Sequence, residues 1–158
     1  MNSMDETTFS KSVASGDLSG TSTYSAGIVQ ANAHRALRRL TDSLLKPYGL
    51  TTMHWFILGT IYDATDGINA SDISAKLGTT LAYITTAANV LEARSMIERI
   101  NSPTDNRYKT LHITAGFSGQ CIEIETYLRQ KLRDSVYAKV GPEDFRAYLK
   151  VTCQLSKV

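Results

Sequence analysis

The feature that most constrains this fold is a pair of short helical segments joined by almost no loop. Asn69 is a typical helix cap with Asp72 three residues later, and Gly78 supplies the left-handed stop of a helix of about eight residues. Thr79 or Thr80 then starts a second helix. Its apolar positions recur at steps of three and four: Leu81, Ile84, Ala88 and Leu91. Two helices with such a tight turn outline a helix-turn-helix, a weak signal by itself because helical hairpins are common.

The segment after these helices strengthens the signal. Met96, Ile97 and Ile100 precede a turn-rich stretch, "SPTDN", and Leu111 and Ile113 follow it. Such a pattern predicts two short strands with the turn between them. A two-stranded hairpin directly after a helix-turn-helix is a wing, and an arginine at its tip can reach a DNA minor groove, where the negative potential is deepest. The sequence therefore predicts a winged helix-turn-helix domain over residues 51–115.

Further helices are predicted before this domain. Residues 1–23 are rich in Ser, Thr and Gly and show no period, so we expect a flexible tail. Residues 24–50 carry the stripe of an amphipathic helix that Pro47 and Gly49 end. That stripe consists of Ala33, Leu37, Leu40 and Leu44. Thr51 or Thr52 is the expected cap of the next helix, whose run "MHWFILGTIY" is apolar nearly all round and predicts burial on most sides.

The last part of the chain, residues 116–158, is typical of an interface. One apolar stripe consists of Ile124, Leu128, Leu132 and Val136, accompanied by Cys121 and Tyr127. Pro142 then opens a final helix, with Glu143 and Asp144 complementing its dipole. The apolar face of that helix consists of Phe145, Tyr148, Leu149 and Thr152. These faces exceed what a winged helix of ~70 residues can cover, which favours a dimer. The predicted fold is mainly α with a small β-hairpin, a winged helix-turn-helix domain flanked by N- and C-terminal dimerisation helices.

From Tyr24 to the C-terminus the sequence resembles the MarR family of winged-helix transcriptional regulators. The matching stretches are "KPYGLTTMHWFIL", "ASDISAKLG", "YITTAANVLEARSMIERI" and "SPTDNRYKTLHITAGF". The Asp-x-Arg at Asp105 and Arg107, followed by the strand end Leu-x-Ile-Thr, is the most specific of them. The resemblance implies a homodimer whose first and last helices intertwine. It also implies that each subunit places the second helix of its helix-turn-helix, the recognition helix, in the major groove of a pseudo-palindromic operator, with the wing in the flanking minor groove.

The resemblance assigns roles in the wing but leaves the recognition helix open. It makes Arg107 the wing arginine and Asp105 the residue that orients the wing, although Asp105 also suits a plain Asx turn. Members of the family often carry arginines at the positions of Thr86 and Val90, and this chain has none there. Base readout would then fall to Asn89 on adenine and to small side chains on thymine methyl groups, which predicts an A·T-weighted operator. The alternative is a helix that no longer reads bases. The predicted DNA-binding residues are Ser71, Thr79, Thr80, Ala82, Tyr83, Thr85, Thr86, Asn89, Asp105, Arg107 and Lys109.

Charge adds little to this prediction. The formal net charge of +2 does not by itself indicate a nucleic-acid partner. Over residues 69–113 five basic side chains stand against four acidic ones: Lys76, Arg94, Arg99, Arg107 and Lys109 against Asp72, Glu92, Glu98 and Asp105. Because residues 69–113 are nearly neutral, we expect modest DNA affinity with a shallow salt dependence.

Regulation by a small molecule is implied by the resemblance alone. Members of the family bind small aromatic or phenolic ligands in a crevice between the dimerisation helices and the winged domain, and by position His34, Arg38, His54 and Trp55 are the candidates here. An arginine and a histidine suit a carboxylate or phenolate, and a tryptophan can stack on a ring. The alternative is structural: a core Trp55, a helix-start His54, and a solvated face for His34 and Arg38. No cofactor is expected.

Other classes of function find less support in the sequence. Cys121 and Cys153 have no metal-ligand spacing and no adjacent Lys or His, which argues against a thiol-based redox switch. There is no phosphate loop, nucleophile elbow or metal-binding pair to indicate an enzyme. A long apolar run and a signal peptide are both missing, so we expect a cytoplasmic protein without a membrane partner. A winged helix used only for binding proteins is the main alternative.

Overall fold

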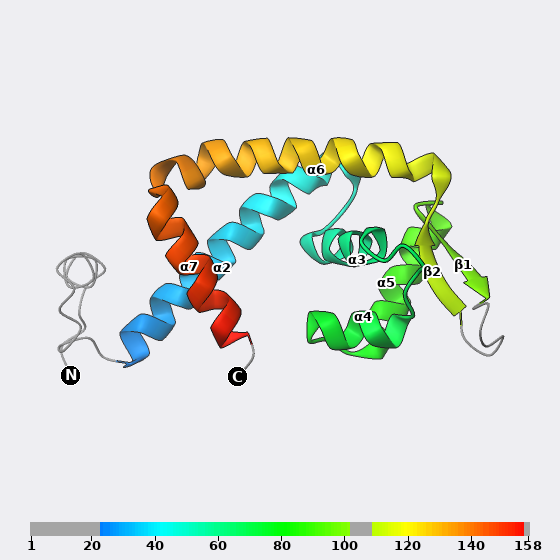
Figure 1. The fold of residues 1–158 in the computed structure, drawn as a ribbon, viewed down its shortest axis with the longest axis horizontal. Coiled ribbons are helices and arrows are strands. Elements are labelled where there is room, and N and C mark those ends of the chain that lie inside the picture. The colour runs from blue at the N-terminus through cyan, green and yellow to red at the C-terminus, as the bar shows by residue number, and fades with distance from the viewer. Residues whose placement is uncertain (1–22, 102–108, 157–158) are drawn as a thin grey trace. The chain divides into compact units, whose positions relative to one another are not determined.

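The computed structural model describes residues 23–101 and 109–156. The chain divides into two compact units, Met1–Thr52 and Met53–Val158. Figure 1 shows the helices and strands coloured by their order along the chain. The predicted tail 1–23 therefore lies outside the described residues except for Thr23. The predicted fold class is confirmed, since the described elements are helices apart from one two-stranded antiparallel sheet. Among the described residues no helix is long and apolar enough to cross a membrane.

The first unit is built on one long helix. Helix α2 spans Thr23–Leu45, and a 3-10 turn over Lys46–Tyr48 follows it. Gly49 closes that turn with a φ of 64°, which is the left-handed conformation expected of a helix stop. Pro47 and Gly49 thus end the helix as predicted. Leu45 and Leu50 are buried on either side of this turn, and their backbones are joined by a hydrogen bond of 3.3 Å.

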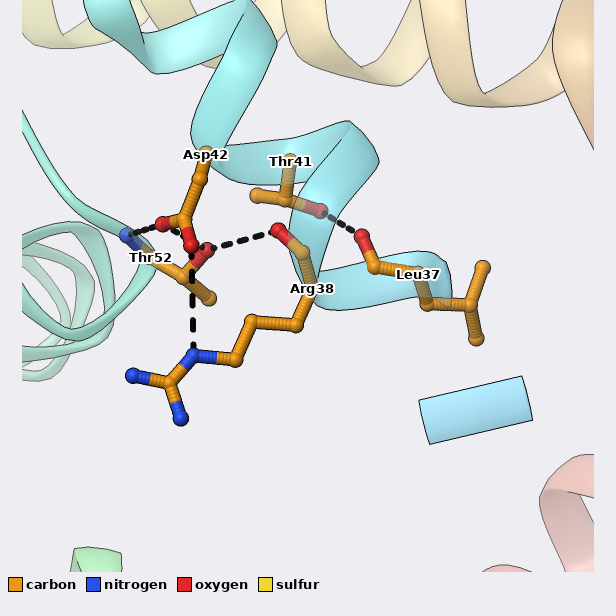
Figure 2. Close-up of polar contacts among 5 residues, drawn as sticks. All are labelled: Leu37, Arg38, Thr41, Asp42 and Thr52. Carbon is orange, nitrogen blue, oxygen red and sulfur yellow. Dashed lines mark hydrogen bonds and ion pairs between the residues drawn. The ribbon is translucent and has the colours of Figure 1, made fainter. Parts of the chain in front are cut away.

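Helix α3 (Thr52–Tyr62) begins on a cap that the sequence did not indicate. The carboxylate of Asp42, on α2, accepts hydrogen bonds from both the backbone N–H and the hydroxyl of Thr52, each at 2.7 Å (Figure 2). Arg38 lies one turn earlier, with its Nε 3.9 Å from the same carboxylate. These hydrogen bonds lower the pKa of Asp42 below its ordinary value. An anion held at a helix N-terminus also complements the helix dipole. Thr51 immediately precedes α3, at the position of the expected cap.

Helix α3 is buried or half-buried on most sides, as predicted, because only Phe56 and Tyr62 among its residues are exposed. Ile57, Leu58 and Ile61 are fully or almost fully buried, whereas Phe56 is 49% and Tyr62 44% exposed. An all-round apolar pattern shows that a helix can be covered, but what covers it depends on tertiary neighbours. The less buried side of α3, with Trp55, Gly59 and Tyr62, forms one wall of a cavity.

Helices α4 (Ala70–Leu77) and α5 (Leu81–Ala93) form the helix-turn-helix, and they pack on one another. Ile73 is fully buried on α4, and α5 also packs on the hairpin. The buried residues of α5 are Ile84, Ala87, Ala88 and Leu91. The expected first member of this stripe, Leu81, is instead 51% exposed. Leu81 is the first residue of the helix, and Ala87, which the predicted stripe did not include, is buried at 5% exposure.

The hairpin consists of β1 (Ile97–Asn101) and β2 (Lys109–Ile113), paired antiparallel with Arg99 opposite Leu111. Ile68 adds an isolated bridge to Leu111, so a short third segment enters the hairpin from the loop before α4. Gly67, with a φ of 77°, precedes it, and the ring of His112 occupies the space that a Cβ at Gly67 would need. The predicted turn between the strands lies outside the described residues.

Helices α6 (Ala115–Ser135) and α7 (Pro142–Leu155) complete the second unit, separated by a 3-10 turn over Tyr137–Lys139 (Figure 1). The stripe of α6 is buried at Phe117, Cys121, Ile124 and Leu128 but only half-buried at its far end, Leu132 and Val136. Pro142 opens α7, with Glu143 and Asp144 in its first turn, as predicted. No described residue of α7 is buried. The apolar side chains of this helix therefore remain largely in solvent within one chain.

Candidate nucleic-acid interface and cavity

Three local caps fix the geometry of the helix-turn-helix. The side chain of Asn69 accepts a 2.8 Å hydrogen bond from the backbone N–H of Asp72 and donates one of 2.8 Å to its carboxylate. Gly78 ends α4 with a φ of 61°, and Thr80 caps α5 by accepting from the N–H of Tyr83 at 3.3 Å. The turn between the helices is thereby held by residues within three positions of one another. This explains why the sequence predicts it closely.

One face of α5 is turned to solvent. Its exposed residues are Ala82, Tyr83, Thr85, Thr86, Asn89, Val90 and Ala93. The hydroxyl of Thr85 donates to the carbonyl of Leu81 at 2.9 Å, and that of Thr86 to the carbonyl of Ala82 at 3.0 Å. With their protons used in this way, both hydroxyls retain acceptor capacity only. The face therefore offers methyl groups, the acceptor hydroxyls of Thr85 and Thr86, the phenol of Tyr83 and one amide, and no cation.

Asn89 is held by the hairpin. Arg99, on β1, donates a 2.7 Å hydrogen bond from Nη2 to Oδ1 of Asn89. The other terminal nitrogen, Nη1, pairs with Glu92, also on α5. The Arg99 side chain is only 24% exposed, so it bridges helix and strand rather than projecting into solvent. Sequence reasoning missed this contact, because the partners lie on different elements and no local spacing connects them.

The remaining predicted DNA-binding residues surround this face unevenly. Ser71 is exposed in the first turn of α4, Thr79 is half-buried and Thr80 exposed in the turn, and Lys109 is exposed at the start of β2. Asp105 and Arg107, the predicted wing residues, lie outside the described residues. The described part of the surface thus brings the helical candidates together but leaves the tip of the wing undescribed.

The predicted ligand-binding residues do not form one described cluster. His34 and Arg38 are exposed on α2, in the first unit, where Arg38 pairs with Asp42. His54 is half-buried in the second unit, and its burial, followed by the nearby charge of Arg94, lowers its pKa below the ordinary value. Its imidazole is therefore neutral at neutral pH. Trp55 lies beside it in the sequence and lines a cavity.

That cavity measures about 580 Å³ and lies between α3 and α6. Its lining from α3 and the residue after it comprises Trp55, Gly59, Tyr62 and Asp63. Its lining from α6 comprises Cys121, Ile122, Glu125, Thr126 and Arg129. Pockets for small ligands usually fall between ~300 and ~1,000 Å³. The cavity is thus large enough for an effector molecule.

The cysteines offer no reactive thiolate pair. Cys121 is buried, and the pKa of its thiol is raised by burial and then by the charges of Glu125 and Asp63. A raised pKa opposes thiolate formation and hence oxidation. Cys153 is a free, exposed cysteine on α7. Within the described ranges, no group of His, Cys, Asp or Glu side chains has the arrangement of a metal site.

Comparisons with known proteins agree with this geometry. Residues 48–107 match the model of the MarR family. The structure resembles the transcriptional repressor CouR bound to a 23-mer DNA duplex, with a TM-score of 0.76 and 21% identity over 82% of this chain and 91% of that one. The structure of CouR from Rhodococcus jostii RHA1 bound to p-coumaroyl-CoA matches with a TM-score of 0.73 and 18% sequence identity. The match covers 87% of this chain and 92% of that one. AbsC from Streptomyces coelicolor, a MarR family transcriptional regulator, matches with a TM-score of 0.75 and 18% sequence identity. The match covers 85% of this chain and 91% of that one.

Proposed function

We propose that this chain is a transcriptional repressor of the MarR family, whose model matches residues 48–107, and that it binds a pseudo-palindromic operator as a homodimer and is released by a small aromatic or phenolic ligand. The observation that carries this proposal is the solvent-exposed face of α5, held in a capped helix-turn-helix directly before a hairpin. CouR, whose structure this chain resembles, is a transcriptional repressor and has been seen on duplex DNA.

The exposed face of α5 favours A·T base pairs. Methyl groups of Ala82, Thr86 and Val90 suit thymine methyl groups, and the amide of Asn89 suits adenine. Guanine is read most often by arginine or lysine, and the exposed face of α5 carries neither. Selection of binding sites from a random duplex library would test this. An A·T-weighted motif with two inverted half-sites is expected, and a motif dominated by G·C pairs would contradict the assignment.

A dimer is supported by the apolar residues of α7. Tyr148, Leu149, Val151 and Leu155 are each between 46% and 54% exposed in the single chain. A row of large apolar side chains in solvent is costly, and a second copy related by a two-fold axis would cover it. Two recognition helices related in this way would meet successive major grooves about 34 Å apart.

Release by a ligand is supported by the cavity between α3 and α6 and by its aromatic lining, Trp55 and Tyr62. CouR, again, is known with p-coumaroyl-CoA bound. The candidates His34, Arg38 and His54 stay predictions. Binding of a ligand in the cavity would act on α3 directly, and α3 is joined to the helix-turn-helix by a loop of seven residues, 63–69. We place the protein in the cytoplasm, where its DNA would be.

A protein-interaction module is the second candidate, favoured by the uncharged surface of α5. The salt dependence of binding distinguishes these two functions. DNA binding releases counterions and weakens as the salt concentration rises, whereas the affinity of an apolar protein interface changes little.

A further inference from the structure

The cavity between α3 and α6 has an unusual balance of charge for a site expected to hold an aromatic acid. Two carboxylates line it, Asp63 and Glu125, against the single guanidinium of Arg129. The lining therefore carries a net negative charge. His54, which could have added a positive charge near Trp55, has a lowered pKa and is neutral at neutral pH.

The one guanidinium in the lining is already engaged. Arg129 donates from Nη2 to Oε1 of Glu125 at 2.9 Å and from Nε to the same oxygen at 3.3 Å. No side chain among the described residues forms an ion pair with Asp63. The carboxylate of Asp63 is therefore the uncompensated charge of the cavity.

The thiol of Cys121, which lines the cavity from α6, is affected by the same two carboxylates. After burial, the charges of Glu125 and Asp63 are the causes that raise its pKa. A negative field disfavours the thiolate, and for the same reason it disfavours a bound carboxylate or phenolate.

The aromatic part of the lining fits a positively charged guest. Trp55, Gly59 and Tyr62 follow one another at steps of four and three and so share a face of α3. Gly59 leaves the space between the two rings open, because nothing lies within 4 Å of where its Cβ would be. Tryptophan is the strongest partner for a cation over an aromatic face.

We propose that this cavity binds a small aromatic cation, such as a quaternary or protonated ring nitrogen compound, with the ring against Trp55 and Tyr62 and the charge facing Asp63. The consequence for DNA release rests on the proposed function, but the binding itself does not. An aromatic acid, the ligand class first expected for His34, Arg38 and His54, would meet the wrong charge here.

The test uses the full-length protein and two probes that share one ring system, N-methylacridinium and acridine-9-carboxylate. Binding is measured by calorimetry and by quenching of Trp55, the only tryptophan of the chain. Asp63→Asn should weaken binding of the cation by roughly fivefold, the effect of a partly exposed ion pair near ~1 kcal/mol. Arg129→Gln removes the partner of the Glu125 carboxylate and should strengthen binding of the cation. Glu123→Gln, which removes a charge from the exposed side of α6 outside the lining, is the matched control and should change nothing.

Tighter binding of the cation than of the carboxylate, with opposite effects of the Asp63 and Arg129 substitutions, would support the proposal. Equal or tighter binding of acridine-9-carboxylate, binding of neither probe, or identical behaviour of Asp63→Asn and Glu123→Gln would overturn it. Operator binding is measured on the same preparations. A protein that binds the cation but no DNA would refute the regulatory function while leaving the ligand class of the cavity established.

Discussion

The guanidinium of Arg99, on strand β1, donates a 2.7 Å hydrogen bond to the side-chain oxygen of Asn89, on the exposed face of α5. An amide oxygen has two lone pairs, so Arg99 occupies one and fixes how the amide is turned. One lone pair and both N–H donors remain for a base edge. The hairpin therefore positions the one amide that the recognition helix offers.

This arrangement predicts that Arg99→Ala weakens base discrimination without abolishing DNA binding. Freed from Arg99, Asn89 samples more rotamers, and we expect a loss of about 1 kcal/mol, or roughly fivefold, in preference at a single operator position. Glu92→Gln is the control, because it removes the charge partner of Arg99 but leaves the contact with Asn89 intact. Competition binding with duplexes altered one base pair at a time measures the effect. A uniform loss across all positions would mean that Arg99 acts only on stability.

Gly67 predicts a clear stability effect. Its φ of 77° is strained for any residue with a Cβ, and that Cβ would overlap the ring of His112. Gly67→Ala should lower the free energy of unfolding by at least ~1 kcal/mol. Gly119→Ala in α6, where nothing lies within 4 Å of the added carbon, should raise it by roughly 0.5 to 1 kcal/mol. Urea denaturation distinguishes the two, and equal effects would contradict the described loop geometry.

The contact between Asp42 and Thr52 predicts a dependence of stability on pH. The pKa of Asp42 is lowered in the folded protein, so its contribution is present above the ordinary carboxylate value near ~4 and is lost as the pH falls through the folded value. Asp42→Ala should cost about 1 kcal/mol at neutral pH, typical of a lost helix cap. Thermal unfolding of the variant and the wild type should draw together as the pH falls below ~4 and should coincide only below the lowered pKa of Asp42 in the folded protein. A difference that persists unchanged in acid would exclude the charge of Asp42 as its cause.

The apolar surface of α7 predicts an effect on assembly. Leu155→Glu places a charge on the row formed with Tyr148 and Val151 and should shift the protein toward monomer in sedimentation velocity. Lys150→Glu changes the charge of α7 by two units, compared with one for Leu155→Glu. Because Lys150 lies on the opposite side of the helix, this variant should leave the dimer intact. Similar behaviour of both variants would show that charge rather than the apolar row decides assembly.

The sequence predicts the parts of this molecule that depend on near neighbours. Asn69, Gly78 and Thr80 act within three residues of their partners, and the structure has each of them in the expected role. The sequence does not predict contacts between elements that are distant along the chain. Asp42 reaches Thr52, and Arg99 reaches Asn89, across ten residues in each case and without a repeating spacing.

The candidate ligand site shows the same limit. Periodicity identified α3 as apolar on all sides but could not show that Phe56 and Tyr62 remain exposed. The cavity is formed by a face of α3 and a face of α6, which only the tertiary fold brings together. Of the four predicted ligand-binding residues, Trp55 alone belongs to its lining.

Sequence-specific DNA binding by this protein can be measured by fluorescence anisotropy on a labelled duplex from upstream of its own gene. Wild type, Arg107→Ala and Gln130→Ala, a control at an exposed position of α6 outside the cavity lining, are compared at two salt concentrations. We expect salt-sensitive binding to the labelled duplex in preference to a scrambled one, and we expect only the Arg107 substitution to weaken it. Equal binding of both duplexes at low salt, unaffected by Arg107→Ala, would contradict sequence-specific DNA binding and direct the search to protein partners.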